Sequence, residues 1–176
     1  MTSDLVLTLI GPDRPGLVEE VASVVSGEGG NWLESRMAHL AGKFAGILRV
    51  EVPTTQRDRL EKALAALESK GLRIVVGASA ESPAGEPRQT MNLELVGLDR
   101  PGLVREVSRL LASQAINVEE LSTDRSSAPM SAEPIFRAVA RVNVPAGVNV
   151  VELRQSLERL AGDLMVEIQL APGATG

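Results

Sequence analysis

A seven-residue turn occurs twice in this chain. The segment GPDRPGL at 11–17 returns as GLDRPGL at 97–103, 86 residues further on, and at the same interval Asn31 falls on Asn117. A motif that recurs at a fixed interval indicates a duplicated supersecondary unit. We therefore expect the 176 residues to form two small domains of similar fold.

Each copy shows the same order of hydrophobic patterns, with alternation for strands and three-to-four-residue spacing for helices. The first copy predicts a strand at 5–10, a helix marked by Leu17, Val21 and Val25, strands around 32–41 and 44–52, a helix marked by Leu60, Leu64 and Leu67 and capped by Gly71, and a strand at 72–77. The second predicts a strand at 91–97, a helix marked by Leu103, Val107 and Leu111, strands at 116–123 and 136–144, a helix ending at Gly162, and a strand at 164–170. Pro15 is predicted at the first helical position, where no amide hydrogen bond is needed.

The order β-α-β-β-α-β is that of a ferredoxin-like split βαβ unit. The predicted fold class is α+β, with two antiparallel four-stranded sheets in tandem and two helices on one face of each. The predicted boundaries are a first domain at 1–79, a linker at 80–89, a second domain at 90–171 and a tail at 172–176. The Ser-, Pro- and Ala-rich segment 124–134 is predicted to be a loop. Apolar residues on the sheet face without helices would need a cover, from the other copy or from a second chain.

Composition excludes several classes of function. The chain has no Cys and a single His, so disulfides, thiolate metal sites and cysteine nucleophiles are excluded, and histidine catalysis has little scope. Net charge is −5 and aromatic residues make up 2%, which argues against direct binding of nucleic acid. No apolar run reaches membrane-spanning length, and the N-terminus lacks a signal-peptide pattern. We expect a cytoplasmic protein without cofactor or metal, and not an enzyme.

The doubled DRPGL turn, with an Asn opening the second strand, resembles the ACT domain, a regulatory module that often binds amino acids. Two such modules in tandem resemble the glycine cleavage system transcriptional repressor family. The segment INVEELSTDRSSAPMSAEPIFRAVARVNVP (116–145) is the most specific part of that resemblance, which covers nearly the whole chain. Formyltetrahydrofolate deformylases, nucleotidyltransferase sensors and small stand-alone ACT proteins carry similar modules, but we expect no catalytic domain of the kind that the enzymes among them have.

The family resemblance implies a non-enzymatic regulator with glycine as its signal. It implies that the protein represses glycine cleavage genes through a LysR-type transcriptional activator, without binding DNA directly itself. It also implies pairing of ACT modules, as a homo-oligomer or within one chain. A different class of function stays open, namely an interaction module of the ACT type that binds no ligand and acts only by protein–protein contact.

The two turns provide most of the candidate ligand-binding residues. A helix N-terminus offers free N–H groups to a carboxylate, glycine permits close approach, and arginine can add a bidentate contact. The same features also serve a purely structural turn, and the sequence does not separate the two interpretations. Asn31 and Asn117 either adopt turn conformations or hold a ligand across an interface. The candidate residues are Asp13, Arg14, Pro15, Gly16 and Asn31 in the first copy, and Asp99, Arg100, Pro101, Gly102 and Asn117 in the second.

Two remaining residues have plainer interpretations. His39 stands without partnering acids in the sequence, so we interpret it as a surface or strand residue rather than a metal ligand. Trp32 is expected to pack in a core or an interface.

Overall fold

The computed structural model describes residues 1–80, 87–127 and 133–173, and the chain divides into two compact units, Met1–Ser82 and Pro83–Gly176. The N-terminal unit consists of β1 (Thr2–Pro12), α1 (Leu17–Gly27), β2 (Asn31–Leu40), β3 (Lys43–Pro53), the 3-10 turn η1 (Thr54–Gln56), α2 (Arg57–Ala66), the 3-10 turn η2 (Leu67–Lys70) and β4 (Arg73–Ala78). The C-terminal unit consists of β5 (Arg88–Leu98), α3 (Leu103–Ser113), β6 (Asn117–Ser127), β7 (Pro134–Pro145), α4 (Val150–Leu164) and β8 (Val166–Pro172).

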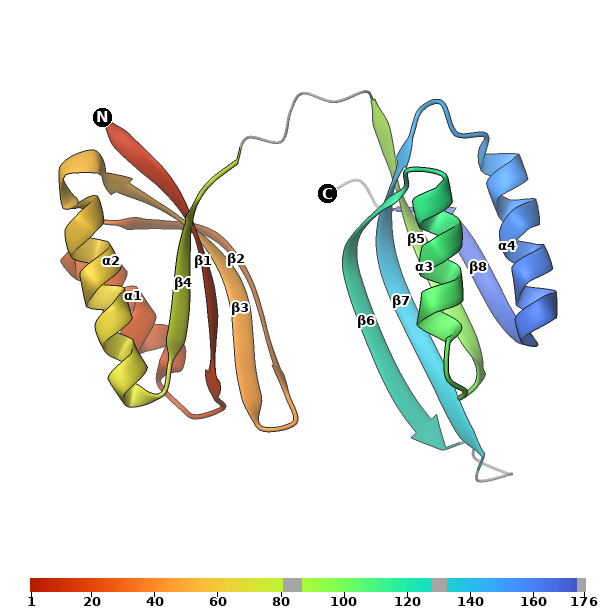
Figure 1. Ribbon diagram of the computed structural model, residues 1–176, viewed down its shortest axis with the longest axis horizontal. Helices are drawn as coiled ribbons and strands as arrows, with labels where there is room; N and C mark the ends of the chain where they lie inside the picture. Colours follow the sequence, from red (N-terminus) through yellow and green to blue (C-terminus); the bar gives the residue numbers. More distant parts are fainter. Residues whose placement is uncertain (81–86, 128–132, 174–176) are drawn as a thin grey trace. The chain divides into compact units, whose positions relative to one another are not determined.

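Each unit is one antiparallel four-stranded sheet. The strand orders are β2-β3-β1-β4 and β6-β7-β5-β8, so the first strand of each unit occupies a central position. Both helices of a unit lie on the same face of its sheet (Figure 1). The predicted fold class, two ferredoxin-like βαββαβ units in tandem, is confirmed.

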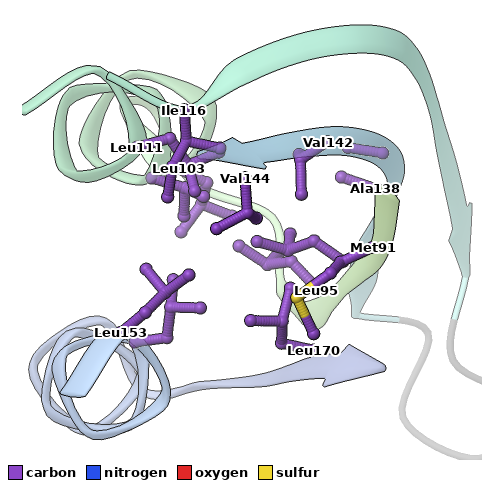
Figure 2. Packing of buried hydrophobic residues seen from close by; sticks show 14 residues of the cluster. Met91, Leu95, Leu103, Leu111, Ile116, Ala138, Val142, Val144, Leu153 and Leu170 are labelled. Atoms are coloured by element: carbon purple, nitrogen blue, oxygen red, sulfur yellow. The ribbon is translucent and has the colours of Figure 1, made fainter. Parts of the chain in front are cut away.

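Alternation along the central strand determines which face of the sheet is buried. Leu5, Leu7 and Leu9 of β1 are buried, and the matching residues of β5 are Met91, Leu93 and Leu95. Because strand side chains alternate between faces, each series meets the apolar stripe of the two helices above it. In the C-terminal unit, Leu103 and Leu111 of α3 and Leu153 of α4 are directed into this core (Figure 2).

The faces without helices differ between the units. In the N-terminal sheet, Thr8 pairs with Ile47 on one side and Val75 on the other, and these two apolar side chains are 56% and 60% exposed. In the C-terminal sheet the corresponding strand residue is Glu94, which forms an ion pair of 2.7 Å with Arg137. At this level of the strand the first unit has the exposed pair Ile47 and Val75, where the second has Glu94 beside Val139.

Four of the boundaries that differ from the predictions have a clear local cause. Helix α1 begins at Leu17, so Pro15 precedes the helix and the left-handed Gly16 stands at its N-cap. Helix α4 continues past Gly162 and ends at Leu164, and the C-cap residue Met165 has a left-handed φ of 52°. The other two differences concern strands. Strand β5 begins at Arg88, inside the expected linker 80–89, because it pairs with the end of β7. Strand β6 runs to Ser127 because residues 124–127 pair with β7, so the predicted loop 124–134 is shorter, and its residues 128–132 lie outside the described ones.

Candidate functional site

Four residues connect the first strand to the first helix of each unit and form a tight elbow, Asp13–Gly16 in one and Asp99–Gly102 in the other. A backbone hydrogen bond fixes the start of each elbow to the turn before β3 or to the first residue of β7. The N–H of Asp13 donates to the carbonyl of Gly42 at 3.0 Å, and the N–H of Asp99 donates to that of Pro134 at 2.8 Å. The repeated sequence motif thus produces the same backbone structure in both units.

The last residue of each elbow requires a positive φ. Gly16 has φ 88° and Gly102 has φ 98°, a region that L-residues with a Cβ rarely adopt. No heavy atom would lie within 4 Å of a Cβ added at either position, so backbone conformation, rather than crowding, determines the choice of glycine.

The helix starts behind these glycines are open to an acceptor. Among the described residues, no side chain caps α1 or α3, whereas Asn149 Oδ1 accepts from the N–H groups of Val151 and Glu152 at the start of α4. The first-turn N–H groups of a helix carry partial positive charge and lack partners within the helix. Both elbows therefore present backbone donors of the kind that bind carboxylates.

In the first elbow, Arg14 is paired within its own unit. Its guanidinium donates to both carboxylate oxygens of Glu20, at 2.9 and 3.1 Å. This bidentate contact lowers the pKa of Glu20 and raises that of Arg14, the hydrogen bonds being the largest cause. Asp13, by contrast, has no ion-pair partner in the described part of the chain.

The second elbow uses different partners. Asp99 forms an ion pair of 2.7 Å with Arg125 of β6, and Arg100 donates to the backbone carbonyl of Leu164 at the end of α4. Glu106, which matches Glu20, lies 3.6 Å from Arg109 instead of bonding the elbow arginine. The backbone of the elbow is thus repeated, but its electrostatics are not.

A shallow depression lies beside the first elbow. Its volume is about 450 Å³, and it combines the charged elbow with the apolar start of the helix. It is lined by Asp13, Arg14, Gly16, Leu17, Val18, Glu19, Ala22 and Phe44.

The two asparagines do not join the elbow of their own unit. Asn31 pairs with Glu51 and so lies level with Asp4, whereas the elbow follows Pro12 at the other end of β1. Eight residues of strand separate these levels, which is about 27 Å at the usual rise. Asn117 opens β6 in the same way, opposite Asn143. An elbow and the asparagine of the same unit therefore do not form one site.

Sequence reasoning did not identify the partners of the elbow charges. Glu20 and Glu106 were visible as a repeated pair, but nothing in the sequence indicated that only Glu20 bonds the elbow arginine. Arg125 matches His39 at the interval of the repeat, since each stands opposite a phenylalanine of the next strand.

His39 is an exposed strand residue. In the described ranges, no group of three or more His, Cys, Asp or Glu could hold a metal ion. No helix in these described ranges is long and apolar enough to cross a membrane.

The N-terminal unit, with its fold and its elbow, matches a known domain family. Residues 3–76 match the family model of the ACT domain, and the C-terminal unit repeats the topology and the elbow. The N-terminal unit thus matches the ACT domain, and the C-terminal unit is similar to it in strand order and elbow.

The chain resembles the glycine cleavage system transcriptional repressors of Escherichia coli K12 and Shigella flexneri, each 24% identical over 161 residues that cover 91% of this chain and 85% of the relative. A crystal structure of an unknown protein from Galdieria sulphuraria is 28% identical with a TM-score of 0.83, over 99% of this chain and 100% of that one.

Replacing the elbow glycine should reveal its conformational role. We expect Gly16→Ala to destabilise the N-terminal unit by about 1 kcal/mol, because alanine disfavours the left-handed conformation. Gly27→Ala, at the end of α1 and equally uncrowded, should be neutral or stabilising by about 0.5 kcal/mol. Urea unfolding of the full chain measures both. Equal effects of the two substitutions would contradict the assignment.

The pair between Arg14 and Glu20 predicts a pH dependence. Because the pKa of Glu20 is lowered in the folded protein, its stabilising effect is fully present above its ordinary value of 4.5 and is lost as pH falls through the lowered pKa. Glu20→Gln should therefore lower the melting temperature most above about pH 5, and the difference from wild type should shrink below about pH 4. Glu19→Gln removes a neighbouring carboxylate and is the matched control. A constant difference across this range would contradict the role of the ion pair.

Proposed function

We propose that this protein is a non-enzymatic regulator that senses a small amino acid at its elbows and represses glycine cleavage genes through a protein partner. The observation that carries the proposal is the pair of uncapped helix starts behind Gly16 and Gly102, in a chain that matches a named repressor over most of its length.

The elbow chemistry supports an amino acid as ligand. Backbone N–H groups at the start of α1 or α3 can receive its carboxylate, and the nearby carboxylate of Asp13 can receive its ammonium group. Arg14 lies at the same depression and could exchange Glu20 for a ligand carboxylate at little net cost, since one charged pair replaces another. Glycine is the favoured ligand, because the relatives are named for the glycine cleavage system.

The charge of the chain supports action through a protein. A net charge of −5 disfavours direct contact with the DNA backbone. The family resemblance points to a LysR-type transcriptional activator as the partner. The apolar row formed by Ile47 and Val75 on the helix-free face of the N-terminal sheet offers a surface for association with a partner or with another ACT module.

Calorimetric titration of the full chain tests amino-acid sensing. We expect glycine to bind. If the first elbow holds its carboxylate, Arg14→Ala should weaken binding about tenfold, and if the second elbow holds it, Arg100→Ala should do so. A tenfold loss corresponds to the loss of about one charged hydrogen bond. Arg59→Ala, an exposed arginine of α2 outside the elbow, should leave the affinity unchanged. Absence of binding by glycine and by the other common amino acids would overturn the sensing role.

One observation favours the alternative function of an interaction module without ligand. Arg14 and Arg100 are both already bonded inside their own units, as a structural turn would require. Capture of the purified LysR-type activator on the immobilised chain, with and without glycine, distinguishes the two functions. A sensor should change its capture when glycine is added. A pure interaction module should bind equally in both conditions and lose capture on Arg14→Ala in the absence of any amino acid.

A further inference from the structure

An apolar cavity lies inside the C-terminal unit, between α3 and the strands beside it. Its volume is about 140 Å³, and Ser108 contributes the one side chain of its wall that is not a hydrocarbon. Its principal wall residues are Val104, Val107 and Leu111 of α3, Val118 and Leu121 of β6, and Ala140 of β7.

The cavity can be reached from solvent. Three of its wall residues, Val104, Val118 and Leu121, are 40%, 36% and 49% exposed. Every residue of β6 is exposed, so α3 does not cover this strand as a packed neighbour would. Large aliphatic side chains that are exposed around one hollow mark an entrance rather than a sealed packing defect.

At two positions that match the cavity wall, the N-terminal unit has larger side chains. Trp32 pairs with Val50 as Val118 pairs with Val142, and Leu48 pairs with Leu7 as Ala140 pairs with Leu93. Trp32 packs against the first core, and Leu48 is fully buried in it. Valine and alanine at these two matching positions leave space open beside α3. The depression beside the first elbow is lined by Val18, Ala22 and Phe44, which match Val104, Ser108 and Phe136, so the hollow differs between the units in its position and depth.

The chemistry of the walls limits what can enter. Protein interiors are close-packed, and a void without partner atoms forgoes dispersion contacts that a guest of matching shape would restore. Hydrocarbon walls offer water almost no hydrogen-bond partners, and a hollow of this size accepts an apolar guest no larger than about one benzene ring. A charged group would lose its hydration without a compensating partner.

We propose that this cavity is a binding site for one compact hydrocarbon group, of the size of a branched aliphatic side chain or a single aromatic ring. Glycine has no such group, so the site is separate from the glycine sensing proposed above and does not depend on it. The C-terminal unit would then recognise a second, apolar feature at a place where the N-terminal unit has Trp32 and Leu48.

Methyl NMR of the full chain with benzene as the probe tests the site. We expect benzene to shift the methyl signals of Val107 and Leu111 saturably, and Ala140→Leu, which restores the residue of the first unit, to weaken this binding at least tenfold. Val118→Trp restores the other filling residue and keeps the test valid if Ala140→Leu does not fold. Val139→Leu, one position along β7 and on the face without helices, is the matched control and should bind as wild type does.

A reciprocal variant and a second set of probes complete the test. Leu48→Ala should create the equivalent site in the N-terminal unit and bring new benzene-dependent shifts there.

L-leucine and L-isoleucine distinguish the source of the hydrocarbon group. Shifts that Ala140→Leu abolishes would assign it to a free amino acid, whereas shifts with benzene alone would assign it to a molecule without the amino-acid head group. No saturable shift with any of these probes, or equal binding by wild type and both filled variants, would overturn the proposal whatever glycine does.

Discussion

The alternation of leucines along the central strand is the constraint on which each unit depends. In β1 and β5 every second residue is a large apolar side chain buried at the centre of the sheet. A slip of one residue in register would turn the whole row toward the face without helices, so pairing with both neighbouring strands is strongly specified. That register also decides where the strand ends against the β2–β3 or β6–β7 hairpin, and therefore where the elbow and the helix start must lie.

The two copies share this backbone structure but differ in side chains at positions that strand pairing and turn geometry do not constrain. The elbow backbone is the same, yet Arg14 bonds a carboxylate of its own helix, whereas Arg100 reaches the end of α4. The cores differ as well, since Leu48 is matched by Ala140. A duplication that keeps strand register and turn geometry can therefore hold different side-chain contacts in its two halves.

The sequence predicted what local patterns control, and it did not predict what tertiary contacts control. Element order, the helix-covered face and the elbow follow from alternation, helical spacing and the glycines. Pro15 was placed inside the helix because its φ suits that position, but the left-handed Gly16 intervenes and starts the helix later. Polar residues at 124–127 suggested a loop, but ladder pairing with β7 outweighs their turn preference. The separation of Asn31 from its elbow, and the partners of Arg14 and Arg100, depend on register and side-chain direction.

Gly16 stands in open space, with φ positive and no atom near the place a side chain would take. The constraint at this position is therefore one of handedness and not of size. A D-amino acid has the mirror-image preference and favours the conformation that glycine merely permits. A chain assembled by chemical ligation with D-alanine at position 16 would hold the elbow more firmly than the natural one, with its backbone donors still open to an approaching carboxylate.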